Sequence, residues 1–176
     1  MNKKNKKGFS LIELNFVLAI IGVLTMIIVM AWNQYIYQSK IKTANSSAKV
    51  IFNAAQSECI KQESIERLQK PDDRYIGDGN FFFYWDGSSA SSGDDETALT
   101  NHGKDDAFAR VINKIADDGV YKIFISDYTV QSVVYSPDSV SRYMGAYPTK
   151  TEEIVNVATP KPAHVTMSDY ILGATP

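Results

Sequence analysis

Glu13 has the most unusual placement of any charged side chain in this sequence. It stands directly before Leu14–Trp32, a 19-residue run in which only Asn15 and Thr25 carry polar side chains. A carboxylate that enters apolar surroundings without a partner costs several kcal/mol. Glu13 is therefore expected either to pair with a cation or to remain at a membrane interface, where the N-terminus of a helix stabilises negative charge.

The run that follows Glu13 has the length of a membrane span. At 1.5 Å per residue, a helix over 14–32 is about 28 Å long, close to the thickness of the hydrocarbon core. Four lysines lie within the first eight residues, and they are expected to keep the N-terminus cytoplasmic. A secretory signal would have a shorter apolar core of about 7–15 residues before a small-residue cleavage site. Val29-Met30-Ala31 is only a weak match to such a site.

The residues before the run form a recognisable motif. Lys6-Lys7-Gly8-Phe9-Ser10-Leu11-Ile12-Glu13, followed directly by the apolar run, resembles the leader of the type IV pilin superfamily. The resemblance covers residues 3–32. It implies that a membrane-embedded prepilin peptidase cuts between Gly8 and Phe9 and then N-methylates the new amino terminus, Phe9. It also implies that Glu13, the fifth residue of the mature chain, pairs with the amine of a neighbouring subunit during assembly.

Behind the apolar run, the pattern changes to that of an amphipathic helix. No proline occurs from residue 9 until Pro71. Apolar residues recur at spacings of three and four, which places them on one face of a helix; they are Ile41, Ala44, Ala48, Ile51, Phe52, Ala55 and Cys59. We therefore predict one helix from Phe9 to between Gln62 and Lys70. A coiled coil is the alternative for this stripe, but the stripe spans few heptads.

The remainder of the sequence predicts an α+β head. Strands are expected at Phe81–Trp85, Val120–Ser126 and Thr129–Ser136, with a tight turn at Asp127-Tyr128 between the last two. Residues 86–106 are expected to be a polar loop. A short helix is expected around Phe108–Ile115, with Asp105 as its N-cap and Gly119 beyond its end. Two weaker strands are expected at Ile154–Ala158 and His164–Leu172.

Other residues with possible chemistry are better explained without it. The acidic groups at Asp94-Asp95-Glu96, 105–106 and 117–118 lack the alternating spacing of a calcium loop. His102 and His164 have no neighbouring metal-ligand residues in the sequence, so neither predicts a metal site. Cys59 lies on the apolar stripe and is expected to be a small buried side chain rather than a nucleophile.

Composition limits the function classes. Of the 18 basic residues, four lie in the first eight positions, so the remaining 14 face 20 acidic residues, a net charge of −6. No basic surface for a nucleic-acid backbone is expected on the head. A single cysteine excludes an internal disulfide, and no phosphate-binding loop or nucleophile elbow is present. We expect no enzymatic activity, no metal and no cofactor.

The sequence thus predicts an α+β protein with a long N-terminal helix under a small antiparallel head. Its expected parts are a cleaved leader at 1–8, a transmembrane or filament-core half-helix at 9–32, an amphipathic half-helix at 33–70 and a globular head at 71–176. The resemblance implies a structural subunit that enters the cytoplasmic membrane as a single-pass precursor. A prepilin peptidase, pilus assembly machinery and further copies of itself would be its partners, and an extracellular filament its destination.

Two alternatives remain open at this point. A minor pilin, or a pseudopilin of type II secretion or competence, would carry the same leader. A single-pass, membrane-anchored extracellular binding protein belongs to another class. The position of the mature N-terminus would distinguish that last class from a pilin.

Overall fold

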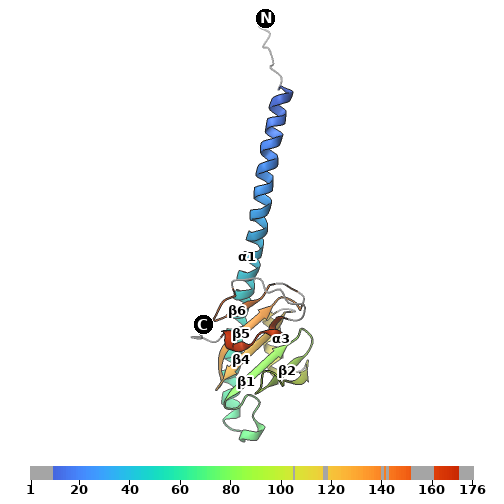
Figure 1. The fold of residues 1–176 in the computed structure, drawn as a ribbon. Helices are drawn as coiled ribbons and strands as arrows, with labels where there is room; N and C mark the ends of the chain where they lie inside the picture. The colour runs from blue at the N-terminus through green and yellow to red at the C-terminus, as the bar shows by residue number, and fades with distance from the viewer. Residues whose placement is uncertain are drawn as a thin grey trace. The chain divides into compact units, whose positions relative to one another are not determined.

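The computed structural model describes residues 10–104, 106–116, 119–139, 141, 143–151 and 161–170. The chain divides into two compact units, Met1–Tyr37 (unit 1) and Gln38–Pro176 (unit 2). Helix α1 (Leu11–Glu66) contributes residues to both units. Figure 1 shows the α+β architecture of unit 2, in which a sheet lies over the second part of α1.

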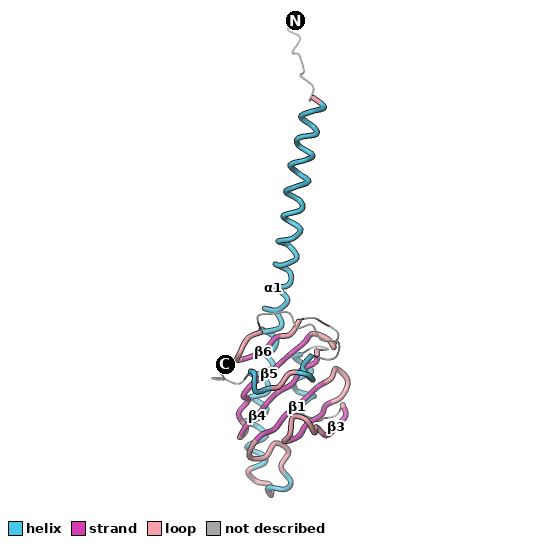
Figure 2. Tube along the Cα trace, in the orientation of Figure 1, coloured by secondary structure: helices cyan, strands magenta, loops and turns pink. Residues whose placement is uncertain are grey.

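Unit 2 contains one antiparallel sheet of six strands in the order β3-β2-β1-β4-β5-β6 (Figure 2). The expected α+β class, with a small antiparallel sheet, a long helix and a short helix, is therefore confirmed. The elements after α1 are η1 (Pro71–Asp73), β1 (Asn80–Trp85), β2 (Ala90–Gly93), β3 (Thr100–Gly103), α2 (Ala107–Ala116), β4 (Val120–Ser126), β5 (Thr129–Ser136), β6 (Gly145–Tyr147), α3 (Lys161–His164) and η2 (Met167–Tyr170).

The apolar stripe of α1 packs against one face of the sheet, as its spacing predicted. Ala44, Ala48 and Ala55 are at most 1% exposed and belong to the same core as Phe83 and Ile123. Small side chains on the helix allow the strands to come close. Gly145 in β6 shows how close: a Cβ atom at this position would lie 2.0 Å from the carbonyl carbon of Ala44.

Strand β1 divides its aromatic side chains between two cores. Phe81, Phe83 and Trp85 point to the helix face and are buried. Phe82 points to the opposite face, where its ring stacks on Phe124 with centroids 4.7 Å apart. Because side chains alternate along a strand, one register places both sets where they can be covered.

The chain near its C-terminus covers the opposite face, but not as the sequence predicted. A strand was expected at His164–Leu172, and the structure instead has α3 and η2 there. Met167 of η2 is fully buried in the core around Phe124. The ammonium of Lys122, only 4% exposed, donates to Glu96 Oε1 at 2.6 Å and to the carbonyl of Val165 at 3.3 Å. This ion pair lets a lysine lie inside an otherwise apolar face.

Two further expectations about the head are wrong, and a third concerns residues that the structure does not describe. The polar loop expected at 86–106 contains β2 and β3, whose short polar strands pair through the backbone without an apolar pattern. The N-cap of α2 is Asp106, not Asp105, because its carboxylate accepts the amides of Phe108 and Ala109 at 2.8 and 3.0 Å. The strand expected at 154–158 lies outside the described residues, as does Asp105.

A buried carboxylate fixes the end of α1, which falls inside the predicted interval. Glu66 is 1% exposed and accepts three hydrogen bonds, from the Tyr128 hydroxyl at 2.7 Å and from the amides of Ile76 and Gly77 at 3.1 Å each. A negative charge at a helix C-terminus is unfavourable, and three donors offset that cost. Tyr128 belongs to the predicted tight turn, where it and Asp127 have φ angles of 59° and 48°.

The close approach of β6 to α1 generates a stability prediction. Gly145→Ala should lower the free energy of unfolding by about 3 kcal/mol, because the added methyl group meets helix backbone that cannot move aside. Gly93→Ala is the matched control, since a Cβ atom there would find its nearest neighbour at 3.4 Å. Urea unfolding of a fragment of residues 31–176 measures both. Equal midpoints for the two variants would contradict this packing.

The buried tyrosines predict loss of stability at alkaline pH. Burial, and then the hydrogen bond to Glu66, raises the pKa of Tyr128 to about 12 from its ordinary value of 10.0. The folded state keeps a proton that the unfolded state releases. This contribution is therefore fully present below pH 10 and is lost as the pH rises towards 12.

Tyr128→Phe should be less stable than wild type at neutral pH by about 1 kcal/mol, because Glu66 loses a donor. Its stability should also fall less steeply between pH 10 and 12. Burial also raises the pKa of Tyr75 and Tyr121, so part of the fall should remain. Urea unfolding across this pH range is the measurement, and identical slopes for the two proteins would refute the assignment.

Candidate processing and assembly site

The described part of the chain begins at Ser10, the second residue after the expected cut. Gly8 and Phe9, the residues expected to flank the cut, lie outside the described residues. Ser10 is the first described residue, and α1 starts at Leu11. Only Glu13 of the expected site residues can therefore be placed.

Ser10 and Glu13 together cap the N-terminus of α1. The Glu13 carboxylate accepts the backbone N–H of Ser10 through Oε2 at 2.9 Å. In return, the Ser10 hydroxyl oxygen accepts the backbone N–H of Ile12 at 3.3 Å. The amide of Leu14 donates to the Ser10 carbonyl at 3.2 Å and closes the first helical turn. This arrangement is a capping box, and it satisfies backbone donors that a helix start leaves without partners.

The capping role of Ser10 is not among the expectations from the sequence, although its signal is present there. Ser10-Leu11-Ile12-Glu13 fits the pattern of serine followed three positions later by glutamate before an apolar run. Within this single chain, Glu13 therefore has a local partner at the helix terminus. The pairing with a neighbouring amine requires a second copy, which the structure does not contain.

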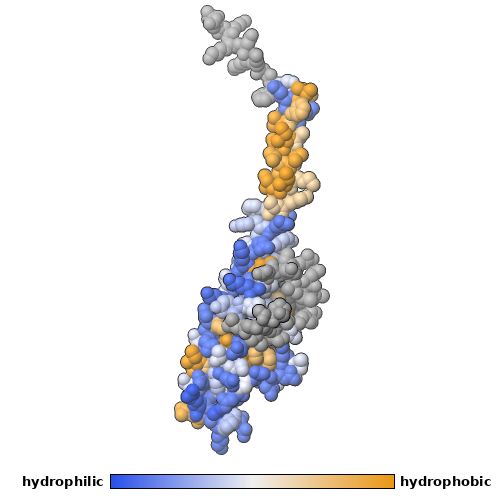
Figure 3. Space-filling view, turned by 60° about the vertical axis from the view of Figure 1, so that its left-hand side comes forward, coloured by the Kyte–Doolittle hydropathy of each residue, from blue (hydrophilic) through white to orange (hydrophobic). Residues whose placement is uncertain are grey.

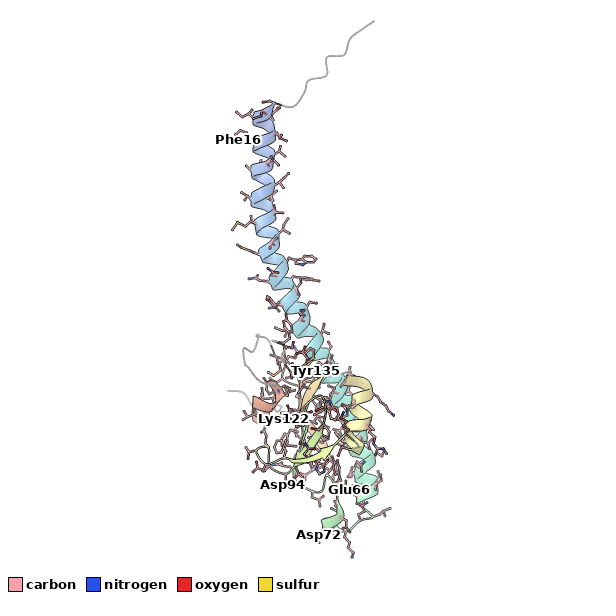
Figure 4. All side chains as sticks on the ribbon, turned by 90° about the vertical axis from the view of Figure 1, so that its right-hand side faces the viewer. Phe16, Glu66, Asp72, Asp94, Lys122 and Tyr135 are labelled. Atoms are coloured by element: carbon pink, nitrogen blue, oxygen red, sulfur yellow. The ribbon has the colours of Figure 1, made fainter. Side chains whose placement is uncertain are left out.

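The apolar run after Glu13 has no cover within the described chain. Its large apolar side chains are 45–66% exposed, and Phe16 at 66% is among the most exposed (Figure 4). Figure 3 shows the resulting apolar surface around this part of α1. Each such side chain gains about 1.5–3 kcal/mol when it leaves water. This part of α1 is long and apolar enough to cross a membrane.

The two polar side chains in the run differ in how they are satisfied. The Thr25 hydroxyl donates to the carbonyls of Ile21 and Gly22 one turn earlier in the helix, a bond that makes threonine tolerable in an apolar medium. The side chain of Asn15 is exposed and forms no hydrogen bond with any residue that the structure describes. Its amide is available to a neighbouring molecule.

Aromatic residues follow at the end of the run. Trp32 and Tyr35 are 61% and 69% exposed, and their ring centroids lie 6.3 Å apart. Tryptophan and tyrosine are common at the level of lipid headgroups, because their rings are apolar and one edge is polar. Their position is consistent with an interface at the outer end of a membrane span.

Unit 2 offers no convergent catalytic group among its described residues. Cys59 is fully buried, as predicted, and burial followed by the nearby Glu58 carboxylate raises the pKa of its thiol to about 12. It therefore stays protonated at neutral pH. His102 is exposed on the edge strand β3, and the side chain of His164 lies outside the description. Within the described ranges, no three His, Cys, Asp or Glu side chains gather in a way that could hold a metal ion.

Comparison with known families identifies the N-terminal segment. Residues 3–29 match the family model described as the prokaryotic N-terminal methylation motif. No curated protein sequence and no solved structure matches the chain. The match covers the leader and most of the apolar run, and it does not extend into unit 2.

The uncovered apolar helix and this match fit a membrane-anchored precursor with an N-terminal methylation motif. That motif is the leader motif of type IV prepilins. It supports a type IV pilin-like or pseudopilin precursor, and the type IV pilin family is a family of structural proteins.

Proposed function

We propose that this chain is the precursor of a structural subunit of an extracellular, type IV pilus-like filament. A prepilin peptidase would cut between Gly8 and Phe9 and N-methylate the amine of Phe9. The observation that carries the proposal is the methylation motif at residues 3–29 placed directly on a helix with an uncovered apolar surface. A leader of this kind has a use only if that helix first enters a membrane.

The apolar surface of unit 1 needs two successive environments. In the precursor, lipid covers the run Leu14–Trp32, and the four lysines of the leader hold the N-terminus on the cytoplasmic side. After cleavage, the same surface can be covered by the helices of neighbouring copies. Assembly machinery would extract the subunit from lipid and add it to the filament core, because apolar contacts of the same kind replace one another at little cost.

Glu13 supplies the specificity that apolar contacts lack. Its local partner is a neutral backbone amide, that of Ser10. Cleavage creates a second partner, the cationic amine of Phe9 on an adjacent copy, and a hydrogen bond between two charged groups is about twice as strong as a neutral one. A subunit in the wrong stagger would leave the carboxylate without its cation in an apolar core. The unpartnered amide of Asn15 adds a second group that favours a particular stagger.

Two other functions fit part of this evidence. A minor pilin, or a pseudopilin of type II secretion or competence, carries the same motif, and the abundance of the subunit in sheared filaments would distinguish a major pilin from both. A membrane-anchored binding protein would use the same apolar helix but would need neither the cut at Gly8 nor the amine of Phe9.

Processing is tested by Gly8→Val. The residue before the cut must enter a narrow peptidase site, where a branched side chain clashes. We expect the variant to accumulate in the membrane as a precursor that is heavier than the mature chain by residues 1–8. Immunoblots of membrane fractions, with and without the peptidase, measure this. Maturation at the normal rate would show that the cut lies elsewhere.

Assembly is tested by separating the two roles of Glu13. Glu13→Ala removes both the cap and the charge, and should reduce the ratio of sheared to membrane-retained subunit at least about ten-fold, because an unpaired amine is left in the core. Glu13→Asp should be intermediate, since the charge remains but its reach is shorter. Wild type and both Glu13 variants should be processed, because Gly8 and Phe9 are unchanged.

Ser10→Ala is the matched control for this experiment. It removes the hydroxyl that caps the helix, at a cost of about 1 kcal/mol, and leaves the Glu13 carboxylate in place. The processed Ser10→Ala subunit should assemble nearly as well as wild type. If Ser10→Ala and Glu13→Ala reduce filament yield equally, Glu13 acts only as a helix cap.

A further inference from the structure

A group of lysines occupies a hollow on the surface of unit 2. Lys42 and Lys49 lie two turns apart on one face of α1, and Lys150 follows β6. Together with Asn45, Ser46 and Tyr147 they line a hollow of about 590 Å³. We call this group, Lys42, Lys49 and Lys150, the lysine site. All three lysines are exposed.

Hydrogen bonds to Asn45 hold the third lysine beside the other two. The Asn45 side chain accepts the amides of Ala146 and Thr151 at 2.8 and 3.1 Å and donates to the Thr151 carbonyl at 2.9 Å. One amide side chain thereby joins α1 to β6 and to the residue that follows Lys150. The hollow is thus fixed by the fold rather than formed by three flexible side chains that happen to meet.

The lysine site lacks counter-charges in the part of the chain that the structure describes. None of the three ammonium groups forms an ion pair there; the one recorded interaction is that of Lys49 with the ring of Tyr147, 5.8 Å from its centroid. Residues 38–57 and 139–151 contain no aspartate or glutamate. Glu152 and Glu153 come next in the sequence and lie outside the description. In a chain with net negative charge, this concentration of cations calls for an acidic partner.

A matching acidic group lies elsewhere on the same unit. Residues 86–96 contain four carboxylates and no cation. Glu96 is paired with Lys122, and Asp86 is engaged by Ser88 and Ser89. Asp94 and Asp95 are exposed at the turn after β2; Oδ1 of Asp95 accepts the amide and the hydroxyl of Thr97 at 2.9 Å each, and both side chains still face solvent. The exposed pair Asp72-Asp73 in η1 is a weaker match, because Lys70 and Arg74 flank it.

The two groups lie towards different ends of unit 2. Tyr135 of β5 pairs with Gly145 of β6, at the end where the lysine site lies. Figure 4 places Asp94 away from Tyr135 and towards Asp72. Complementary patches at separate places on one molecule pair between copies, and such head-to-tail contacts generate open chains unless the rotation closes a ring.

We propose that the lysine site of one copy docks on the acidic turn Asp94-Asp95 of a second copy, and that this contact joins neighbouring subunits outside the helical core. The proposal rests on the proposed filament. It assigns to unit 2 a separate contribution to assembly. Because both groups are exposed, the contact should weaken as salt rises.

Charge reversal in the full-length chain tests the contact. Lys42→Glu/Lys49→Glu should be processed normally but should reduce the sheared fraction about ten-fold, because like charges then face each other across the contact. Adding Asp94→Lys/Asp95→Lys to that variant should restore part of the yield. Lys114→Glu, at an exposed lysine of α2 away from the lysine site, is the control for a single charge reversal and should behave as wild type, whereas Lys49→Glu alone should already reduce the yield.

A cross-linking experiment does not depend on filament yield. Cells that express one chain with Lys49→Cys and another with Asp94→Cys should form a cross-linked dimer with a short bismaleimide, and Cys59, which is buried, should not react. A dimer yield that Lys42→Glu, added to the Lys49→Cys chain, lowers strongly would support the contact even if no filament is sheared. Absence of the dimer in cells that assemble wild-type filaments would overturn the inference while leaving the proposed function intact.

Other occupants of the lysine site give different results. Salt-sensitive binding of the full-length chain to phosphatidylglycerol vesicles or to duplex DNA, lost in Lys42→Glu/Lys49→Glu while the filament yield is unchanged, would assign the lysines to a lipid or nucleic acid and overturn the proposal. Equal losses of filament yield for Lys42→Glu/Lys49→Glu and Lys114→Glu would reduce the effect to net charge and would overturn it as well.

Discussion

The apolar side chains of Leu14–Trp32 have no cover within the described chain, and this constraint explains most of what the N-terminus does. An uncovered surface of this size is unstable in water. It can persist only in lipid or against other copies of the helix. In the proposed function, the lysines of the leader serve the first environment by fixing orientation. Cleavage of the leader and the charge of Glu13 would serve the second, in addition to the cap that Glu13 already forms within its own chain.

In unit 2, by contrast, the apolar stripe of α1 is covered within the chain. Its stripe of alanines, with Cys59 and Ile51, is covered by the sheet, and two carboxylates, one buried and one partly exposed, hold the cover in place from different sides. Glu66 joins the helix end to the turn at Tyr128, and Glu96 joins Lys122 to the backbone amide of Met167. These charges are satisfied within the fold and leave no reactive group. That arrangement is suited to a structural subunit whose exposed charges can serve contacts between copies.

Sequence patterns predicted the elements whose signal is local and repeated. The apolar run, the stripe from Ile41 to Cys59, and the strands around Phe83 and Ile123 each depend on periodicity, and each is present. The predictions failed where pairing partners decide the outcome. Strands β2 and β3 are short and polar, so only the ladder beside β1 reveals them, and Met167 is buried in a short helix because the second face of the sheet needs a cover.

The functional sites differ in the same way: those that depend on local sequence could be predicted, and the one that depends on long-range contacts could not. Glu13 stood out because a charge before an apolar run is costly, and the leader motif gave Gly8 and Phe9 their expected roles. The capping bond between Ser10 and Glu13 was also readable in the sequence, since it links residues three apart. The lysine site was not readable, because Lys150 joins Lys42 and Lys49 only through the hydrogen bonds of Asn45 to β6 and its neighbour. Such a site depends on contacts about a hundred positions apart in the chain.

The most direct test of the proposed function is the mass and sequence of the N-terminus of the chain purified from sheared surface material. We expect a mature chain that begins at Phe9, carries a methyl group on its amine and has lost residues 1–8. A chain that keeps Met1–Gly8, or one that begins at Trp32 after ordinary signal cleavage, would contradict it.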